Sequence, residues 1–167
     1  MTDSSGTHDA WAAALRAHGR RVTKQRLAVL AAVEHHPHSP AEAILAAARQ
    51  ELPDLTAQSV YVVLGDLTDL HMLRRFEPPH SPALYETRVG DNHHHAVCIS
   101  CGRVEDVECA VGHAPCLTPH WNADAKPMTI QIADVLYQGI CQDCQRCLLY
   151  TSPSPRDLST SRMPSSA

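Results

Sequence analysis

Apolar residues recur at helical spacing over most of the first 70 residues, which predicts a helical N-terminal part. Residues 11–17 are expected to form a short helix closed by Gly19. A second helix is expected over residues 24–36, with Thr23 as its N-cap. Its apolar face consists of Leu27, Leu30 and Val33.

The third predicted helix has a well-marked start. Ser39 is expected to be the N-cap, Pro40 stands in the first turn, and Glu42 completes a capping box. His38 then lies just outside this start, a rigid position for a metal ligand.

A fourth helix is expected over residues 55–70. Its inward face would carry Val60, Val63, Leu64, Leu67 and Leu70. Its outward face would carry Gln58, Ser59, Tyr61 and Val62.

Two short strands follow the helices. They are expected over residues 72–77 and 83–88, with a Pro-rich turn between them. Helices followed by a hairpin describe a winged helix-turn-helix, in which the fourth helix would enter the major groove of DNA. A small helical domain of another purpose remains an alternative on element order alone.

Beyond Asp91 the hydrophobic period changes from helical to alternating. Residues 95–109 are expected to form a hairpin around Cys101–Gly102, and residues 128–141 a long strand. Residues 110–125 between them suggest a short helix and a loop. The expected fold class is therefore α+β, with an open sheet edge suited to pairing across a homodimer.

The domain interpretation has three parts. Residues 1–88 would form the winged-helix DNA-binding domain and residues 89–145 a metal-binding dimerisation domain. Residues 146–167 are Ser/Pro-rich and back-translate to what looks like a common sequencing-library adapter. We therefore expect them to be a non-native, disordered tail.

Charge separates the two expected domains. The chain has 14 Lys and Arg against 18 Asp and Glu, but residues 10–33 hold five basic and no acidic residues. Residues 84–145 hold eight acidic residues against three basic ones. A basic first part and an acidic, His- and Cys-rich second part indicate that the two domains have different functions. No segment could span a membrane, so we expect a soluble cytoplasmic protein with reduced cysteines.

Two Cys-x-x-Cys pairs give the strongest chemical signal. Four thiolates from two such pairs form the tetrahedral shell that structural Zn²⁺ prefers. A thioredoxin-like redox pair or buried free thiols would not explain two matching pairs. The predicted structural zinc ligands are Cys98, Cys101, Cys141 and Cys144.

Three consecutive histidines precede the first pair. In a strand, His93 and His95 point to one face and His94 to the other. With zinc satisfied by sulfur, a second ion bound by nitrogen and oxygen is expected, and such a ligand set suits Fe²⁺ or Mn²⁺. An exposed histidine run that binds metal adventitiously is the alternative. The predicted regulatory ligands are His38, Glu86, His93, His95 and Asp106.

Several segments together resemble the ferric uptake regulator (Fur) family. They include "RVTKQRLAVLAAV", "HSPAEAIL", "SVYVVLGDL", "LYETRVGDNHHHAVCISCGRVEDVEC" and "CQDC". "VGDNHHH" and "CAVGHAPCL" resemble the actinobacterial repressors of catalase-peroxidase genes and, more distantly, peroxide sensors of the family. The likeness covers about residues 10–145.

The resemblance implies a dimeric, metal-dependent repressor that binds a palindromic operator in double-stranded DNA, and not an enzyme. It assigns the four cysteines to structural zinc and the five mixed ligands to the regulatory ion. A further family site looks incomplete, because Asn92 and Ala133 stand where some members have histidine; His94 and His113 remain as partial ligands.

DNA contacts are expected from the basic first part and from the wing. Many members have arginine where this chain has Val62, and residues 51–72 contain no Lys or Arg. Phosphates would be bound by Arg20, Arg21, Lys24, Arg26, Arg74 and Arg75. Base edges or nearby phosphates would be contacted by Gln58, Ser59 and Tyr61.

Peroxide or iron sensing is the function expected from the resemblance, with control of oxidative-stress genes. Iron-uptake or zinc-uptake repression is the alternative within the family. A metal-dependent enzyme and a Cys-x-x-Cys redox protein are alternatives of a different class. Cys109 and Cys116 fall outside both ligand sets. Their expected roles are redox-active thiols, ligands of a further metal or heme site, or small apolar side chains that fill space.

Overall fold

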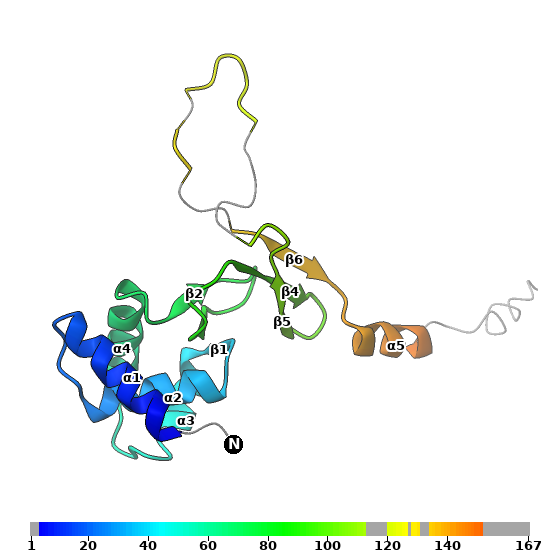
Figure 1. Ribbon diagram of the computed structural model, residues 1–167. Coiled ribbons are helices and arrows are strands. Elements are labelled where there is room, and N and C mark those ends of the chain that lie inside the picture. Colours follow the sequence, from blue (N-terminus) through cyan, green and yellow to red (C-terminus); the bar gives the residue numbers. More distant parts are fainter. Residues whose placement is uncertain (1–3, 113–119, 127, 131–133, 152–167) are drawn as a thin grey trace, which may run out of the picture. The chain divides into compact units, whose positions relative to one another are not determined.

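The computed structural model describes residues 4–112, 120–126, 128–130 and 134–151 (Figure 1). Their contacts divide the chain into two compact units. The helical unit holds the described residues up to His93 and those from Glu108 to Ile130. The cysteine unit holds His94–Val107 and the described residues from Asp134 onward. The division falls within a strand, five residues beyond the boundary predicted after residue 88.

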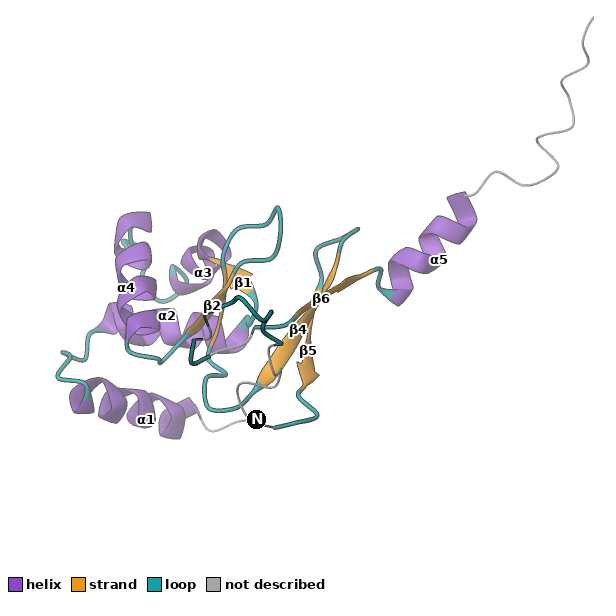
Figure 2. Cartoon of the chain, turned by 90° about the horizontal axis from the view of Figure 1, so that it is seen from above, coloured by secondary structure: helices purple, strands orange, loops and turns teal. Residues whose placement is uncertain are grey.

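Four helices build most of the helical unit (Figure 2). They are α1 (Ser4–Ala17), α2 (Lys24–His35), α3 (Ala41–Ala48) and α4 (Ala57–Asp69). Helix α1 begins earlier than expected, and it ends before Gly19, whose φ of +68° a residue without a side chain adopts easily. The expected N-cap of α2 is confirmed, because the Thr23 hydroxyl accepts a hydrogen bond from the Arg26 backbone N–H at 3.3 Å.

A small antiparallel sheet follows α4 in the helical unit. Its strands are β1 (Ser39–Pro40), β2 (Arg74–Phe76) and β3 (Leu84–Glu86), in the order β1-β3-β2. In the β2–β3 hairpin, Arg74 pairs with Glu86 and Phe76 with Leu84. Helices followed by this hairpin give the expected winged-helix order.

The third helix starts differently from its prediction. Ser39 pairs with Tyr85 in β1, so its backbone belongs to the sheet and cannot cap a helix. Pro40 is the N-cap of α3, and no side chain caps that end. The predicted capping box is therefore wrong, because a strand far along the chain competes for the same backbone.

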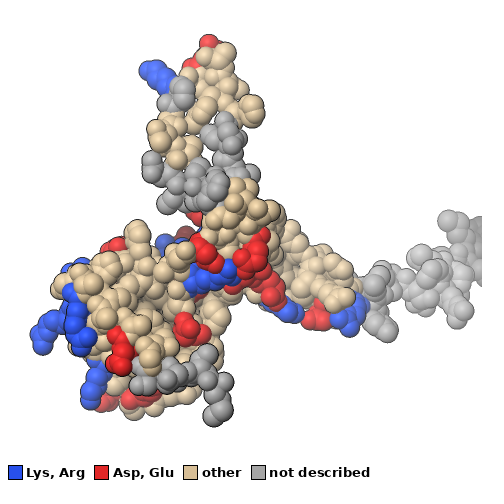
Figure 3. Space-filling model, viewed as in Figure 1, with Lys and Arg blue, Asp and Glu red and all other residues tan. Residues whose placement is uncertain are grey.

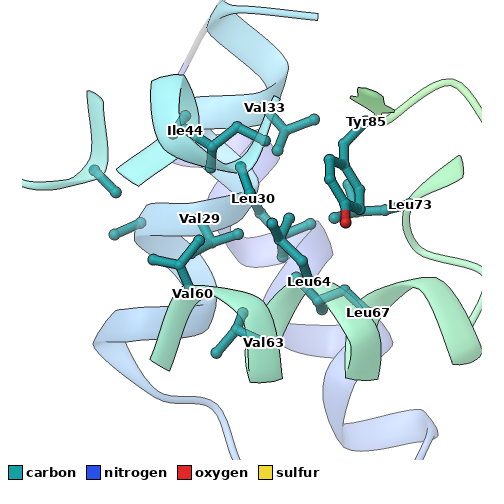
Figure 4. Packing of buried hydrophobic residues seen from close by; sticks show 14 of the residues in the cluster. Val29, Leu30, Val33, Ile44, Val60, Val63, Leu64, Leu67, Leu73 and Tyr85 are labelled. Carbon is teal, nitrogen blue, oxygen red and sulfur yellow. The ribbon is translucent and has the colours of Figure 1, made fainter. Parts of the chain in front are cut away.

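Apolar side chains from α2, α3 and α4 form one core in the helical unit (Figure 4). Leu30 on α2, Ile44 on α3 and Leu64 on α4 are all fully buried. Tyr85 and Leu73 close the core from the side of the hairpin. The inward face predicted for α4 is confirmed at four positions, while Leu70 is only partly buried.

The cysteine unit contains a second three-stranded sheet and a helix. Strands β4 (His93–Cys98), β5 (Val104–Glu108) and β6 (Leu136–Gly139) follow the order β5-β4-β6. Strand β6 runs parallel to β4, pairing His95 with Leu136. The long strand predicted over residues 128–141 is thus reduced to β6 within its described part, and residues 128–130 are irregular.

Helix α5 (Gln142–Thr151) follows directly after β6. It crosses the boundary predicted after residue 145, so residues 146–151 are helical instead of disordered. A contact of 3.3 Å between Arg146 and Asp143 spans one turn, and no proline interrupts the chain before Pro153. Across the described ranges, no helix is long and apolar enough to cross a lipid bilayer.

Candidate functional site

Four cysteine thiols converge in the cysteine unit. Cys98 ends β4, Cys101 follows in the turn, and the second pair stands at the start of α5. The Sγ atoms of Cys98, Cys101, Cys141 and Cys144 lie within 4.8 Å of one another. Two pairs separated by about forty residues meet because β6 runs beside β4 and ends next to it. This arrangement matches the sulfur shell of a closed structural zinc site.

The backbone around Cys98 holds its thiol in place. The Cys141 N–H donates to Cys98 Sγ at 3.3 Å, and the Gly102 N–H donates to the Cys98 carbonyl at 2.8 Å. Gly102 has a φ of +76°, a value that most residues adopt only with strain. The tight turn therefore depends on glycine immediately after Cys101.

The pKa values of Cys98 and Cys144 are shifted in opposite directions. Hydrogen bonds from the backbone N–H groups of Cys141 and Cys101 lower the pKa of Cys98 to about 6. The Ser100 hydroxyl acts to lower the pKa of Cys144, but the neighbouring thiols outweigh it and raise that pKa to about 12. A bound dication supplies the charge that allows all four sulfurs to ionise together.

A buried carboxylate contacts two histidines in the helical unit. Glu86 on β3 is 1% exposed and His93 is fully buried. Glu86 Oε1 lies 3.0 Å from His93 Nε2, and Oε2 lies 3.2 Å from His38 Nε2. One carboxylate and two imidazole rings therefore converge at a largely buried position, a donor set that suits a metal ion bound by nitrogen and oxygen.

The backbone of His38 is held in an uncommon conformation. Its φ is +57°, in the left-handed region that non-glycine residues rarely occupy. The His38 N–H donates to the Tyr85 carbonyl at 2.9 Å, and its ring packs edge-on against Phe76 at 5.8 Å. Such strain persists where surrounding contacts fix it, and it is frequent at ligand sites.

Asp91 is a partner of this cluster that sequence reasoning missed. Its Oδ1 lies 2.9 Å from His93 Nδ1, on the ring nitrogen opposite Glu86. Burial opposes ionisation of Asp91, but hydrogen bonds with His93 and Arg88 outweigh this and lower the pKa of its carboxyl. The signal was present in the sequence, because residues two apart in an extended chain share a face.

Arg74, which the sequence predicts to contact DNA phosphate, is directed toward the same cluster. Its Nη1 donates to the His93 carbonyl at 3.2 Å, and its Nε lies 3.7 Å from Glu86 Oε1. The hairpin register places Arg74 opposite Glu86. Arg75, its neighbour, is exposed and pairs with Glu77.

The other two predicted mixed ligands belong to the cysteine unit. His95 Nε2 lies 3.7 Å from Asp106 Oδ1, between adjacent strands β4 and β5. His94 packs edge-on against Tyr137 of β6 at 6.2 Å. Its separate partner agrees with the alternation predicted for the three histidines. Of the five predicted ligands, three thus belong to the helical unit and two to the cysteine unit.

Basic side chains gather along one edge of the helical unit (Figure 3). Arg20, Arg21 and Lys24 are exposed at the start of α2. Arg26 is less available, because it donates to Asp66 at 2.8 Å and to the Arg21 carbonyl at 2.7 Å. Asp66 on α4 also pairs with Arg20 at 2.9 Å, so it links this basic segment to α4.

The outward face of α4 carries the residues predicted for base contacts. Tyr61 is 54% exposed, Val62 is 60% exposed, and Gln58 is also exposed. The Ser59 hydroxyl lies 2.9 Å from the hydroxyl of the N-cap Thr56, so its first role is at the helix start. Side chains that point outward from α4 are therefore uncharged at its N-terminal half.

The structure describes only some of the remaining cysteine and histidine candidates. Asn92 donates to Cys109 Sγ at 3.1 Å, so Cys109 has a polar neighbour close to the histidine run. Cys116, His113 and Ala133 lie outside the described residues.

The chain matches the family model described as "Ferric uptake regulator family" over residues 17–113. "Transcriptional regulator FurA" of Mycobacterium tuberculosis is 50% identical over 134 residues, 80% of this chain and 89% of that protein. "Ferric uptake regulation protein 1" of Mycolicibacterium fortuitum is 51% identical over 123 residues, 74% of each chain.

Solved structures show the same fold. The Helicobacter pylori ferric uptake regulator superposes with a TM-score of 0.60 at 20% identity, covering 86% of this chain and 94% of that one. A zinc uptake regulator in complex with zinc and DNA superposes with a TM-score of 0.61 at 18% identity, covering 89% and 99%.

Proposed function

Because the chain belongs to the ferric uptake regulator family, we propose that it is a DNA-binding repressor whose operator affinity depends on a regulatory metal ion. The buried Glu86 carboxylate, in contact with ring nitrogens of both His38 and His93, carries this proposal. Glu86 and His93 are buried, and the His38 side chain is only 15% exposed. A divalent ion bound by these three groups would offset the cost of removing them from water. The relatives named above are regulators, which agrees with a binding function over an enzymatic one.

We assign different metals to the two clusters. The four thiols suit Zn²⁺, which would hold β4, β6 and α5 together as a structural ion. The cluster around Glu86 offers nitrogen and oxygen donors, which suit Fe²⁺ or Mn²⁺ as the regulatory ion. His95 and Asp106 would complete the regulatory shell from the cysteine unit.

This shared shell is the proposed link between metal and DNA. An ion bound by His38, Glu86 and His93 on one side and by His95 and Asp106 on the other fixes the angle between the two units. In a homodimer, that angle sets the spacing of two winged helices on successive half-sites of a palindromic operator. Without the ion, the angle between the two units would no longer be fixed, and operator affinity would fall.

Peroxide is the signal we favour over iron supply. With Fe²⁺ bound, hydrogen peroxide would oxidise a coordinating histidine, so that one oxygen atom enters the imidazole and water leaves. His38 and His93 are the candidate targets, because both contact Glu86. The damaged ligand then binds metal weakly, and the repressor leaves the promoter of an oxidative-stress gene.

Two surfaces support the proposal further. Arg20, Arg21 and Lys24 form an exposed basic segment at the start of α2, suited to phosphate contacts, and Arg20 pairs with Asp66 of α4. In the cysteine unit, Tyr137 and Ile140 are exposed at and just after the edge strand β6. An edge strand with exposed apolar side chains suits pairing with a second copy of the chain.

A mobility-shift experiment tests this function. Duplexes bound by the zinc- and Mn²⁺-loaded chain are first selected from a randomised library, and binding is then compared with Mn²⁺ or Fe²⁺, with and without hydrogen peroxide. We expect peroxide to abolish binding only with Fe²⁺, together with a mass gain of one oxygen atom on a peptide containing His38 or His93. Equal binding before and after removal of Mn²⁺ or Fe²⁺ would contradict the metal-dependent mechanism.

Iron-uptake repression is the second candidate function. The name of the M. fortuitum relative favours it, since that protein is called a ferric uptake regulation protein. Its distinguishing result is Fe²⁺-dependent binding that peroxide leaves unchanged and that follows iron concentration alone.

A further inference from the structure

Helix α4 presents an apolar side chain where a groove-reading helix contacts bases. Val62 is 60% exposed and stands beside Tyr61 on the outward face, one turn from Gln58. On the opposite face, Val60, Val63 and Leu64 are buried in the core. The exposure of Val62 is therefore fixed by the packing of the helix.

The same face has no cation for guanine. Recognition of guanine commonly uses the bidentate donors of arginine or lysine, and residues 51–72 contain neither. Arg26 lines a groove together with Val62, but its guanidinium donates two hydrogen bonds to Asp66. Gln58 can pair with adenine, and an aliphatic side chain can contact the methyl group of thymine.

A groove of about 300 Å³ adjoins Val62 in the helical unit. It is lined by Thr23, by Gln25 and Arg26 of α2, and by Gln58, Ser59, Val62 and Val63 of α4. Val62 is the exposed aliphatic side chain of this lining, since Val63 is buried, and polar groups stand beside it. A base edge that carries both hydrogen-bonding atoms and a methyl group would match this lining.

From these observations we infer that Val62 determines operator specificity by packing against the 5-methyl group of a thymine in each half-site. This inference rests on the proposed DNA-binding function and names one specificity-determining contact within it. Removing the methyl group from water on contact with Val62 supplies the discrimination, without any hydrogen bond from that side chain.

Substitution of deoxyuridine for thymine removes only the methyl group and keeps base pairing. The full chain, loaded with zinc and Mn²⁺, is titrated against the duplex selected from a randomised library, with each thymine replaced in turn. At one thymine of each half-site, we expect affinity to fall about three- to fourfold, the effect of one buried methyl-sized group. In Val62→Ala, the same replacement should have no further effect.

Val111→Ala is the matched control, because Val111 is an exposed valine outside α4. In this variant, each deoxyuridine replacement should lower DNA affinity as much as it does in the wild type. The inference about Val62, but not the proposed DNA-binding function, would be overturned if deoxyuridine lowered affinity equally in wild type and Val62→Ala. It would also be overturned if no thymine methyl group affected binding. Failure to select any duplex would instead overturn the proposed DNA-binding function, and the Val62 contact with it.

Discussion

The Asp91 carboxylate lies 2.9 Å from Nδ1 of His93, while Nε2 of that ring faces Glu86. Metal-bound histidines usually donate their second N–H to such a carboxylate, which fixes the tautomer and the ring orientation. With Nδ1 turned toward Asp91, Nε2 is the ring nitrogen that would bind an ion beside Glu86.

Replacing Asp91 by asparagine should weaken Mn²⁺ binding without removing a metal ligand. We expect a loss of about 10- to 100-fold in affinity, because the amide positions His93 less firmly than the carboxylate. Isothermal titration calorimetry of the zinc-loaded chain measures this directly. Asp54→Asn, a change of the same kind at an exposed position, should leave Mn²⁺ affinity and zinc content unchanged.

Removing one thiol of the cysteine cluster should remove the structural ion. In Cys141→Ser, we expect zinc content to fall from about one ion per chain to almost none, since three thiolates do not close a tetrahedral shell. Cys147→Ser changes an exposed cysteine of α5 outside the cluster and should retain zinc. Metal analysis after gel filtration separates these results, and full zinc retention in Cys141→Ser would contradict the site.

The exposed basic segment at the start of α2 should act through phosphates. Arg21→Ala and Lys24→Ala are each expected to weaken all duplexes to a similar degree and to reduce the slope of log K against log salt by about one. Binding measured between low and moderate salt gives that slope. Lys126→Ala, at an exposed position outside this segment, is the control. A loss confined to one sequence would argue for base contact instead.

The core of the helical unit should be sensitive to a single truncation on α4. Leu64 of α4 is fully buried in this core, so Leu64→Ala should lower the free energy of unfolding by about 2–5 kcal/mol. Val62→Ala on the same helix should change it by less than about 0.5 kcal/mol, because Val62 is exposed. Chemical denaturation of both variants, followed by circular dichroism, gives the comparison.

Local patterns were sufficient for several features of the fold. The start of α2 at Thr23 and the inward face of α4 depend on short-range capping and periodicity, which the sequence displays directly. The two Cys-x-x-Cys pairs also carry their ligand chemistry in their spacing, and the structure brings them together.

Features that depend on distant segments were harder to predict. Ser39 loses its expected role as a cap because Tyr85 pairs with it from another part of the chain. Arg74 turns toward Glu86 because hairpin register, and not its neighbours in sequence, decides its face. Strand β6 is short because pairing with β4, and not apolar content alone, defines where a strand exists.

Strand β4 leaves little freedom for changes in chain length. His95 and Cys98 are separated by two residues, and successive side chains of a strand point to opposite faces. Inserting or deleting one residue there would turn either the histidines or the cysteine away from its partners. Homologous genes should therefore tolerate substitutions at Ala96 and Val97 far better than the gain or loss of a codon between His95 and Cys98.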